Sequence, residues 1–227
     1  MCLEAGRSMH VATIVVMQFA KTSTRPHGWK NATTNHTSQN LTTKIMVDQT
    51  IKVENISVEI IVDDYAESPR EWCNMTKFVM FHKRYKLPNE IGIDHNDCTS
   101  WDEMKEALDK EYKWVYPVFM YDHSGIAFSV NAFDCPFDSG QVGFIVSNEG
   151  TPEEAYMHAT SELKTYGDYA NGDVYGVRVF EDTEMIDFQY GYYGCDHEDS
   201  GLKDELDSCL SRITTDEIRQ QILKELL

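Results

Sequence analysis

Residues 121–145, YDHSGIAFSVNAFDCPFDSGQVGFI, alternate apolar runs with polar chain reversals. The runs at 126–130 and 142–147 have the β-branched and aromatic content of strands, and Gly125, Gly140 and Gly143 mark bends. Asp, His, Cys and Ser side chains, which can take part in catalysis or binding, gather at those bends. The stretch therefore predicts strands of an antiparallel sheet, and it places a candidate site at their ends.

Outside this stretch, five segments have the composition or alternation of strands. A strand or hairpin is predicted at 50–62, with its bend at Glu54-Asn55. A second hairpin is predicted from 173–181 and 185–194, joined by the short acidic turn Asp182-Thr183. The remaining strands are predicted at 76–82 and at 114–122, where Pro117 favours a sheet edge or a strand start.

Helices are predicted where capping boxes precede apolar residues at helical spacing. The boxes are Ser100-x-x-Glu103, Thr151-x-x-Glu154 and Thr214-x-x-Glu217, and a fourth helix follows from Leu202, Leu206, Leu210 and Ile213. The helices are not regularly interleaved with the strands. We therefore predict an α+β fold with one largely antiparallel mixed sheet of about six strands, about four helices and an acidic helical C-terminus.

The first 45 residues differ in composition from the rest of the chain. They hold five basic residues against one acidic residue, and residues 21–44 are rich in Thr, Asn, Ser and His. Such a polar tract buries too little apolar surface to form a core. We expect residues 1–45 to be a disordered or dispensable extension, with Met46 as an alternative start to Met1, and residues 46–227 to be a single acidic α+β domain.

The charge of that domain restricts its partners. The chain has 38 acidic and 20 basic residues. Without the one acidic and five basic residues of the extension, 37 acidic and 15 basic residues remain, a net charge of −22. Such a surface repels nucleic acid and anionic membranes and attracts basic proteins. No apolar run reaches the roughly 18 to 20 residues that span a bilayer. We expect a basic protein partner, no direct nucleic-acid binding and no membrane insertion; a merely solvated acidic surface is the alternative.

Six cysteines occur without a CxxC pair, which is compatible with free thiols in a reducing compartment such as the cytoplasm. A zinc site can be drawn from two close pairs, His95 with Cys98 and Cys195 with His197, because tetrahedral zinc takes four nitrogen or sulfur ligands. The alternative is that both pairs lie in solvent-exposed loops. We expect no cofactor, with zinc as the one exception to test.

Residues 122–139 contain the side-chain types of a nucleophilic site. Such a site needs a thiol, an imidazole base beside it and a third group that orients the base. The candidates are Asp122, His123, Asp134, Cys135, Asp138 and Ser139. In the competing interpretation, Asp122 and Asp134 cap turns through their own backbone and Cys135 is a small buried apolar residue.

Four short motifs carry a family resemblance. DHSG at 122–125, CPFDSGQVGFI at 135–145 and GDVYG at 172–176, with ESPREW at 67–72, resemble a family of phage and prophage proteins without an established activity. The resemblance covers roughly residues 58–195 and leaves the extension out. It implies an accessory gene expressed in the cytoplasm of a bacterial host, and it implies no catalytic residues.

Three functions follow from these observations. The favoured one is a non-enzymatic protein that binds and inhibits a basic host protein, such as a nucleic-acid-binding or defence enzyme, its carboxylates standing in for phosphates. The expected binding residues form an acidic C-terminal set: Asp196, Glu198, Asp199, Asp204, Glu205, Asp207, Asp216 and Glu217. The alternatives are a small hydrolase or transferase with a Cys/His or metal site in 121–145, and a structural phage component.

Overall fold

The computed structural model describes residues 49–226, so the predicted extension and the choice between Met1 and Met46 lie outside the described residues. The α+β class and the antiparallel pairing are confirmed. The prediction of one sheet with about six strands is wrong, because residues 49–226 contain eight strands in two four-stranded sheets. Strand composition in the sequence carries no information on which strand pairs with which, and that pairing separates the sheets.

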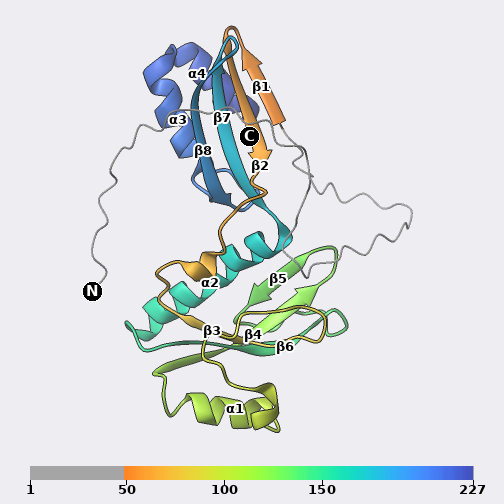
Figure 1. The fold of residues 1–227 in the computed structure, drawn as a ribbon. Coiled ribbons are helices and arrows are strands. Elements are labelled where there is room, and N and C mark those ends of the chain that lie inside the picture. Colours follow the sequence, from red (N-terminus) through yellow and green to blue (C-terminus); the bar gives the residue numbers. More distant parts are fainter. Residues whose placement is uncertain (1–48, 227) are drawn as a thin grey trace. The chain divides into compact units, whose positions relative to one another are not determined.

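The first sheet has the order β1-β2-β7-β8. Its strands are β1 (Gln49–Val53), β2 (Ile56–Val62), β7 (Val174–Glu181) and β8 (Glu184–Tyr193). Both predicted turns are confirmed, and Glu54 and Asp182 adopt positive φ there. The two hairpins come from distant parts of the chain and meet where Val62 pairs with Tyr175. Residues 63–173 are therefore an insertion in this sheet (Figure 1).

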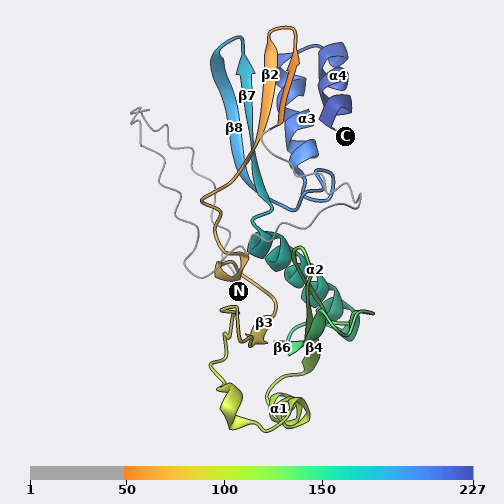
Figure 2. The ribbon, with the colours of Figure 1, turned by 90° about the vertical axis from the view of Figure 1, so that its right-hand side faces the viewer.

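Two helices cover one face of the first sheet, α3 (Leu202–Ile213) and α4 (Asp216–Leu226) (Figure 2). The predicted apolar positions Leu202, Leu206 and Leu210 are fully buried against strand residues such as Val58 and Val177, whereas the fourth, Ile213, is wrong as a buried position because it is 36% exposed at the end of α3. Burying such side chains contributes roughly 1.5–3 kcal/mol each. An apolar contact between helix and sheet therefore stabilises this part of the molecule.

The predicted third capping box is displaced by one residue. Thr214 follows α3 as its C-terminal cap, and its amide donates to Leu210 O at 3.1 Å. Thr215 accepts instead, from the amide of Ile218 at 3.5 Å. The prediction was wrong because Thr-Thr offers two equivalent hydroxyls, and the end of the preceding helix uses the first position.

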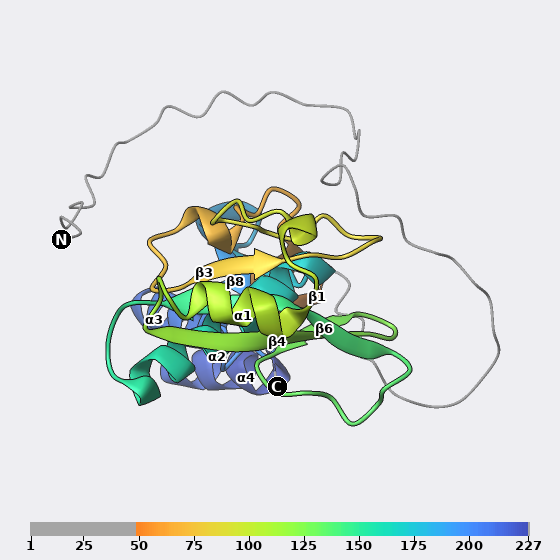
Figure 3. The ribbon, with the colours of Figure 1, turned by 90° about the horizontal axis from the view of Figure 1, so that it is seen from below.

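The inserted residues form the second sheet, with the order β3-β6-β4-β5. Its strands are β3 (Lys77–Met80), β4 (Trp114–Asp122), β5 (Ile126–Ser129) and β6 (Ser139–Ser147). Helix α1 (Trp101–Leu108) packs through Met104 and Leu108 on one face, and Figure 3 shows it lying over the sheet. Helix α2 (Pro152–Asn171) lies on the other face (Figure 1), with Tyr166 against Phe78 and Phe128.

The start of α2 follows the predicted capping box in full, and the start of α1 follows it in part. Thr151 and Glu154 form a reciprocal capping box, with bonds of 2.8 and 3.3 Å between side chain and amide. Ser100 accepts from the amide of Glu103 at 3.2 Å, whereas the Glu103 carboxylate turns back to Thr99. None of the helices in residues 49–226 has the length and apolar content that crossing a bilayer requires.

A buried ionic cluster holds the second sheet to α2. The Arg70 guanidinium, in the short helix η1 (Pro69–Glu71), is 7% exposed and binds Glu90 at 2.8 Å and Glu162 of α2 at 2.7 Å. It also stacks on the ring of Phe78 at 3.8 Å. Glu162 accepts further bonds from Met75 N and from Thr76. Every charge in the cluster therefore has a partner, which is the condition under which buried charges are tolerated.

Candidate functional site

A polar cleft of about 310 Å³ opens where β4 ends and β6 begins. It is lined by His82, Arg84, Met120, Asp122, Phe137, Asp138, Ser139, Gly140, Gln141 and Val142. Most of these residues come from the stretch 121–145, while Met120 precedes it in β4, and His82 and Arg84 come from the loop that follows β3. We call this feature the polar cleft.

Strand pairing brings two carboxylates together in the cleft. Tyr121 pairs with Ser139, and one step further the amide of Asp122 donates to Asp138 O at 2.8 Å. Residues directly opposite in an antiparallel pair project from the same face, with Cβ atoms about 5 Å apart. The chain reverses immediately afterwards at Ser124, which has a φ of 61°. Asp122 and Asp138 are thus a cross-strand pair of like charges.

A single carboxylate oxygen joins three of the predicted catalytic candidates. Oδ2 of Asp138 lies 3.2 Å from Nδ1 of His123 and accepts from Sγ of Cys135 at 3.7 Å. Ser139 supports the same turn, because its hydroxyl donates to Cys135 O at 2.6 Å. Asp134 is exposed and is not part of the cleft lining. The structure therefore brings His123, Cys135, Asp138 and Ser139 together.

The order of these groups differs from that of a nucleophilic site. An activated cysteine needs the imidazole beside the thiol and the carboxylate behind the imidazole. Here the carboxylate of Asp138 lies between Cys135 and His123. The arrangement fixes the turn at 134–139 through polar contacts, and it presents no thiol–imidazole pair.

The other carboxylate is held by residues that sequence reasoning missed. Asp122 Oδ2 pairs with Arg84 and accepts from the hydroxyl of Tyr85 at 2.9 Å. His82 stacks on Tyr85 with ring centroids 4.9 Å apart. Burial, then the charges of Arg84 and Lys83, lower the pKa of His82, and burial raises the pKa of Tyr85. A signal was available in the sequence, because HKRYK at 82–86 is a basic run in an acidic chain.

The acidic C-terminal set is partly neutralised within the protein. Lys203 pairs with Glu198, and Arg219 pairs with Asp207 at 3.0 Å and Asp216 at 3.1 Å. Asp196 accepts from the amides of Asp199 and Glu198, and these bonds lower its pKa. Within residues 49–226, no cation pairs with the remaining five members of the set: Asp196, Asp199, Asp204, Glu205 and Glu217.

The four predicted zinc ligands lie in different surroundings. The His95 ring packs edge-on against Phe81 and Trp101, and Cys98 packs against the α1 core. Cys195 is exposed, whereas His197 is buried beside the Tyr175 ring. In the part of the chain that the structure describes, no three His, Cys, Asp or Glu side chains are placed to hold a metal ion. The structure therefore does not assemble the predicted tetrahedral set.

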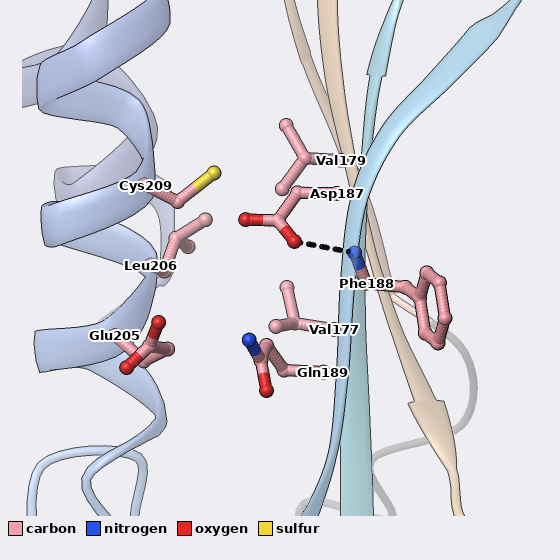
Figure 4. A pocket seen from close by; sticks show the side chains of 8 residues that line it. All are labelled: Val177, Val179, Asp187, Phe188, Gln189, Glu205, Leu206 and Cys209. Carbon is pink, nitrogen blue, oxygen red and sulfur yellow. Dashed lines mark hydrogen bonds between the residues drawn. The ribbon is translucent and has the colours of Figure 1, made fainter. Parts of the chain in front are cut away.

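A second, much smaller cavity of about 10 Å³ lies between α3 and β8 (Figure 4). Cys209 projects from α3 towards Asp187, while Phe188 points away from the helix. Burial, followed by the bond to Asp187, raises the pKa of the Cys209 thiol to about 12. That volume is near the minimum for one water molecule, so the cavity is a packing feature of the helix–sheet contact.

No family model, no curated protein and no solved structure matches this chain.

Proposed function

We propose that the protein acts by binding a basic protein through the acidic C-terminal set on the α3–α4 side of the first sheet. The favoured partner is a host protein that itself binds nucleic acid or serves in defence, and the setting is the bacterial cytoplasm that the phage resemblance implies. The bound partner is inhibited because carboxylates occupy the groove that phosphates would otherwise fill.

One observation carries this proposal. Three of the four basic residues in 194–226, Lys203, Arg212 and Arg219, already pair with carboxylates of this protein. Five members of the acidic set still have no cation among the described residues, and Asp199, Asp204 and Glu217 are exposed. Unpaired carboxylates near a partner accelerate association with a cationic surface and make binding salt-dependent.

The geometry of the polar cleft supports a non-enzymatic role over the hydrolase alternative. Asp138 separates the only predicted thiol from the only predicted imidazole of the stretch 121–145. A hydrolase of the cysteine type would require those two groups in direct contact.

The test uses the full chain as bait in bacterial lysate, with elution by a salt step and identification of the eluted proteins. The identified partner is then purified, and its Kd is measured for the triple variant Asp199→Asn, Asp204→Asn, Glu217→Gln. A matched control removes three exposed carboxylates elsewhere: Glu106→Gln, Glu111→Gln and Glu149→Gln.

We expect the triple variant to bind about tenfold more weakly, since each charge near an interface contributes a few tenths to 1 kcal/mol. The control should change Kd less than about threefold. Binding that survives high salt, or equal weakening by both variants, would show that the α3–α4 carboxylates are not the binding surface.

A further inference from the structure

We propose that the polar cleft binds a primary ammonium group of the kind that a lysine side chain presents. This inference rests on the proposed function, because the lysine would belong to the basic protein that is bound. The cleft then adds one specific contact to an association that is otherwise driven by charge.

The cleft is rich in hydrogen-bond acceptors that the protein leaves unused. Among residues 49–226, the side-chain hydrogen bonds that Asp122 and Asp138 accept all go to Oδ2, which leaves each Oδ1 as an acceptor. Gln141 donates through its amide nitrogen to Gly143 O at 3.3 Å, which leaves its carbonyl oxygen as an acceptor. An ammonium group carries three N–H donors and no acceptor, so it matches this inventory.

The net charge of the cleft lining also favours a cation over an anion. Among the ten lining residues, Asp122 and Asp138 are acidic and Arg84 is basic. His82 is neutral at pH 7, because its pKa is lowered from an ordinary value of 6.5. The lining therefore carries one net negative charge, which a single monovalent cation balances. An anion would meet two carboxylates.

The shape of the cleft suits the carbon chain of a lysine. No heavy atom lies within 4 Å of the position where a Cβ would stand on Gly140, so the space above that residue is open. Beside it, Met120 and Val142 form an apolar floor. Phe137, another lining residue, is 94% exposed. Methylene groups can lie along such a surface while the ammonium reaches polar groups, and an exposed ring also attracts a cation.

The probe is the capped peptide acetyl-Gly-Lys-Gly-amide, titrated into the full-length protein and followed by amide NMR shifts. We expect saturable shifts centred on Ser139 and Gly140. The control peptide has norleucine in place of lysine, which keeps the carbon chain and removes the charge. Equal shifts with norleucine, or shifts confined to α3 and α4, would overturn the inference.

Two variants test the cleft by different means. Gly140→Leu fills the open space without changing charge, and Asp138→Asn removes one acceptor charge. Each should weaken binding of the lysine peptide about tenfold, since a hydrogen bond to a charged group contributes about 1.5–3 kcal/mol. The matched control is Asp134→Asn, which removes an exposed carboxylate from the same loop outside the lining, and it should change Kd less than about twofold.

Amide spectra of each variant establish that the fold is retained, and Asp138→Asn decides the outcome if Gly140→Leu does not fold. Unchanged peptide binding in both folded variants would refute the cleft as the ammonium site. If the natural partner responds to the α3–α4 triple variant and not to Gly140→Leu, the cleft inference fails while the proposed function stands. If it responds only to Gly140→Leu, the proposed surface fails instead.

Discussion

The two sheets of this molecule are held to their helices by different forces. In the first sheet, α3 and α4 bury apolar side chains such as Leu206 and Leu210 against the strands. In the second sheet, Arg70, Glu90 and Glu162 add a buried ionic cluster to the apolar contacts of α2. Sequence periodicity reveals the first kind of contact, because its residues repeat along one helix. It misses the second kind, because those residues lie far apart in the chain.

The largest effect is expected from breaking the ionic cluster. Arg70→Leu leaves Glu90 and Glu162 largely buried without their cation, and it also removes the stacking on Phe78. Removing one partner of a buried pair costs about 3–5 kcal/mol. The measurement is the free energy of unfolding in urea.

The matched control for this variant neutralises the whole cluster by adding Glu90→Gln and Glu162→Gln to Arg70→Leu. Because the uncompensated charges are then gone, we expect most of the lost stability to return. If the triple variant is as unstable as Arg70→Leu alone, packing and not charge is the contribution of Arg70.

A smaller loss is expected in the apolar contact of the first sheet. Leu206 is fully buried beside the 10 Å³ cavity between α3 and β8. Leu206→Ala enlarges that cavity and should cost about 2–4 kcal/mol. Thermal unfolding monitored by circular dichroism tests this value, and a loss below about 1 kcal/mol would mean that α3 closes onto the sheet.

Two glycine substitutions, one in each sheet, should change the stability by smaller amounts. A Cβ on Gly176 in β7 would stand 2.4 Å from the Tyr190 ring, which Arg178 holds through bonds of 3.0 and 2.9 Å. Gly176→Ala should therefore cost about 1–3 kcal/mol through overpacking. Gly140→Ala in the second sheet meets nothing within 4 Å, and its change should stay within about 0.5 kcal/mol. Equal melting temperatures for the two variants would contradict the rigidity of the Tyr190 ring.

The smallest effect concerns two half-buried carboxylates. Burial, then the charge of Asp168, raises the pKa of Asp173, and burial also raises the pKa of Asp168. A raised folded-state pKa means that the folded protein binds the proton more tightly, so stability falls as pH rises from about 4 through that pKa.

Asp168→Asn removes one cause of the shift, so the pKa of Asp173 should fall towards its ordinary value. The loss of stability between pH 4 and pH 7 should then shrink by less than about 1 kcal/mol. An NMR titration of the Asp173 carboxyl measures the first quantity. A rise of that pKa in the variant would exclude repulsion by Asp168 as a cause.

Local features of the fold were predictable from the sequence because they depend on neighbours in the chain. The bend at Glu54 and the capping box of Thr151 are examples, since turn and cap geometry is set within four residues. Pro117 shows the limit. It lies in β4, a central strand, but in the part that precedes the pairing of Phe119 with β5. Its missing N–H is tolerated there, and the sequence could not place that boundary.

The sequence indicated where along the chain the candidate site lies. It did not indicate which side chains bond to one another there. Residues 122–139 do form much of the cleft wall, but the groups that hold Asp122 come from Arg84 and Tyr85, which are 38 and 37 residues away. The shared oxygen of Asp138 also depends on a strand register that composition does not specify. A contact between two polar side chains that lie far apart in the chain produces no periodic pattern in the sequence.

The insertion of residues 63–173 between β2 and β7 has a consequence for biosynthesis. A ribosome releases β1 and β2 early, yet their hairpin alone is marginal and must wait for β7. The inserted sheet has all its strands, together with α1 and α2, before β7 emerges. Because chains grow at about 5–20 residues per second, the inserted sheet can fold first, and the sheet formed by β1, β2, β7 and β8 is completed last.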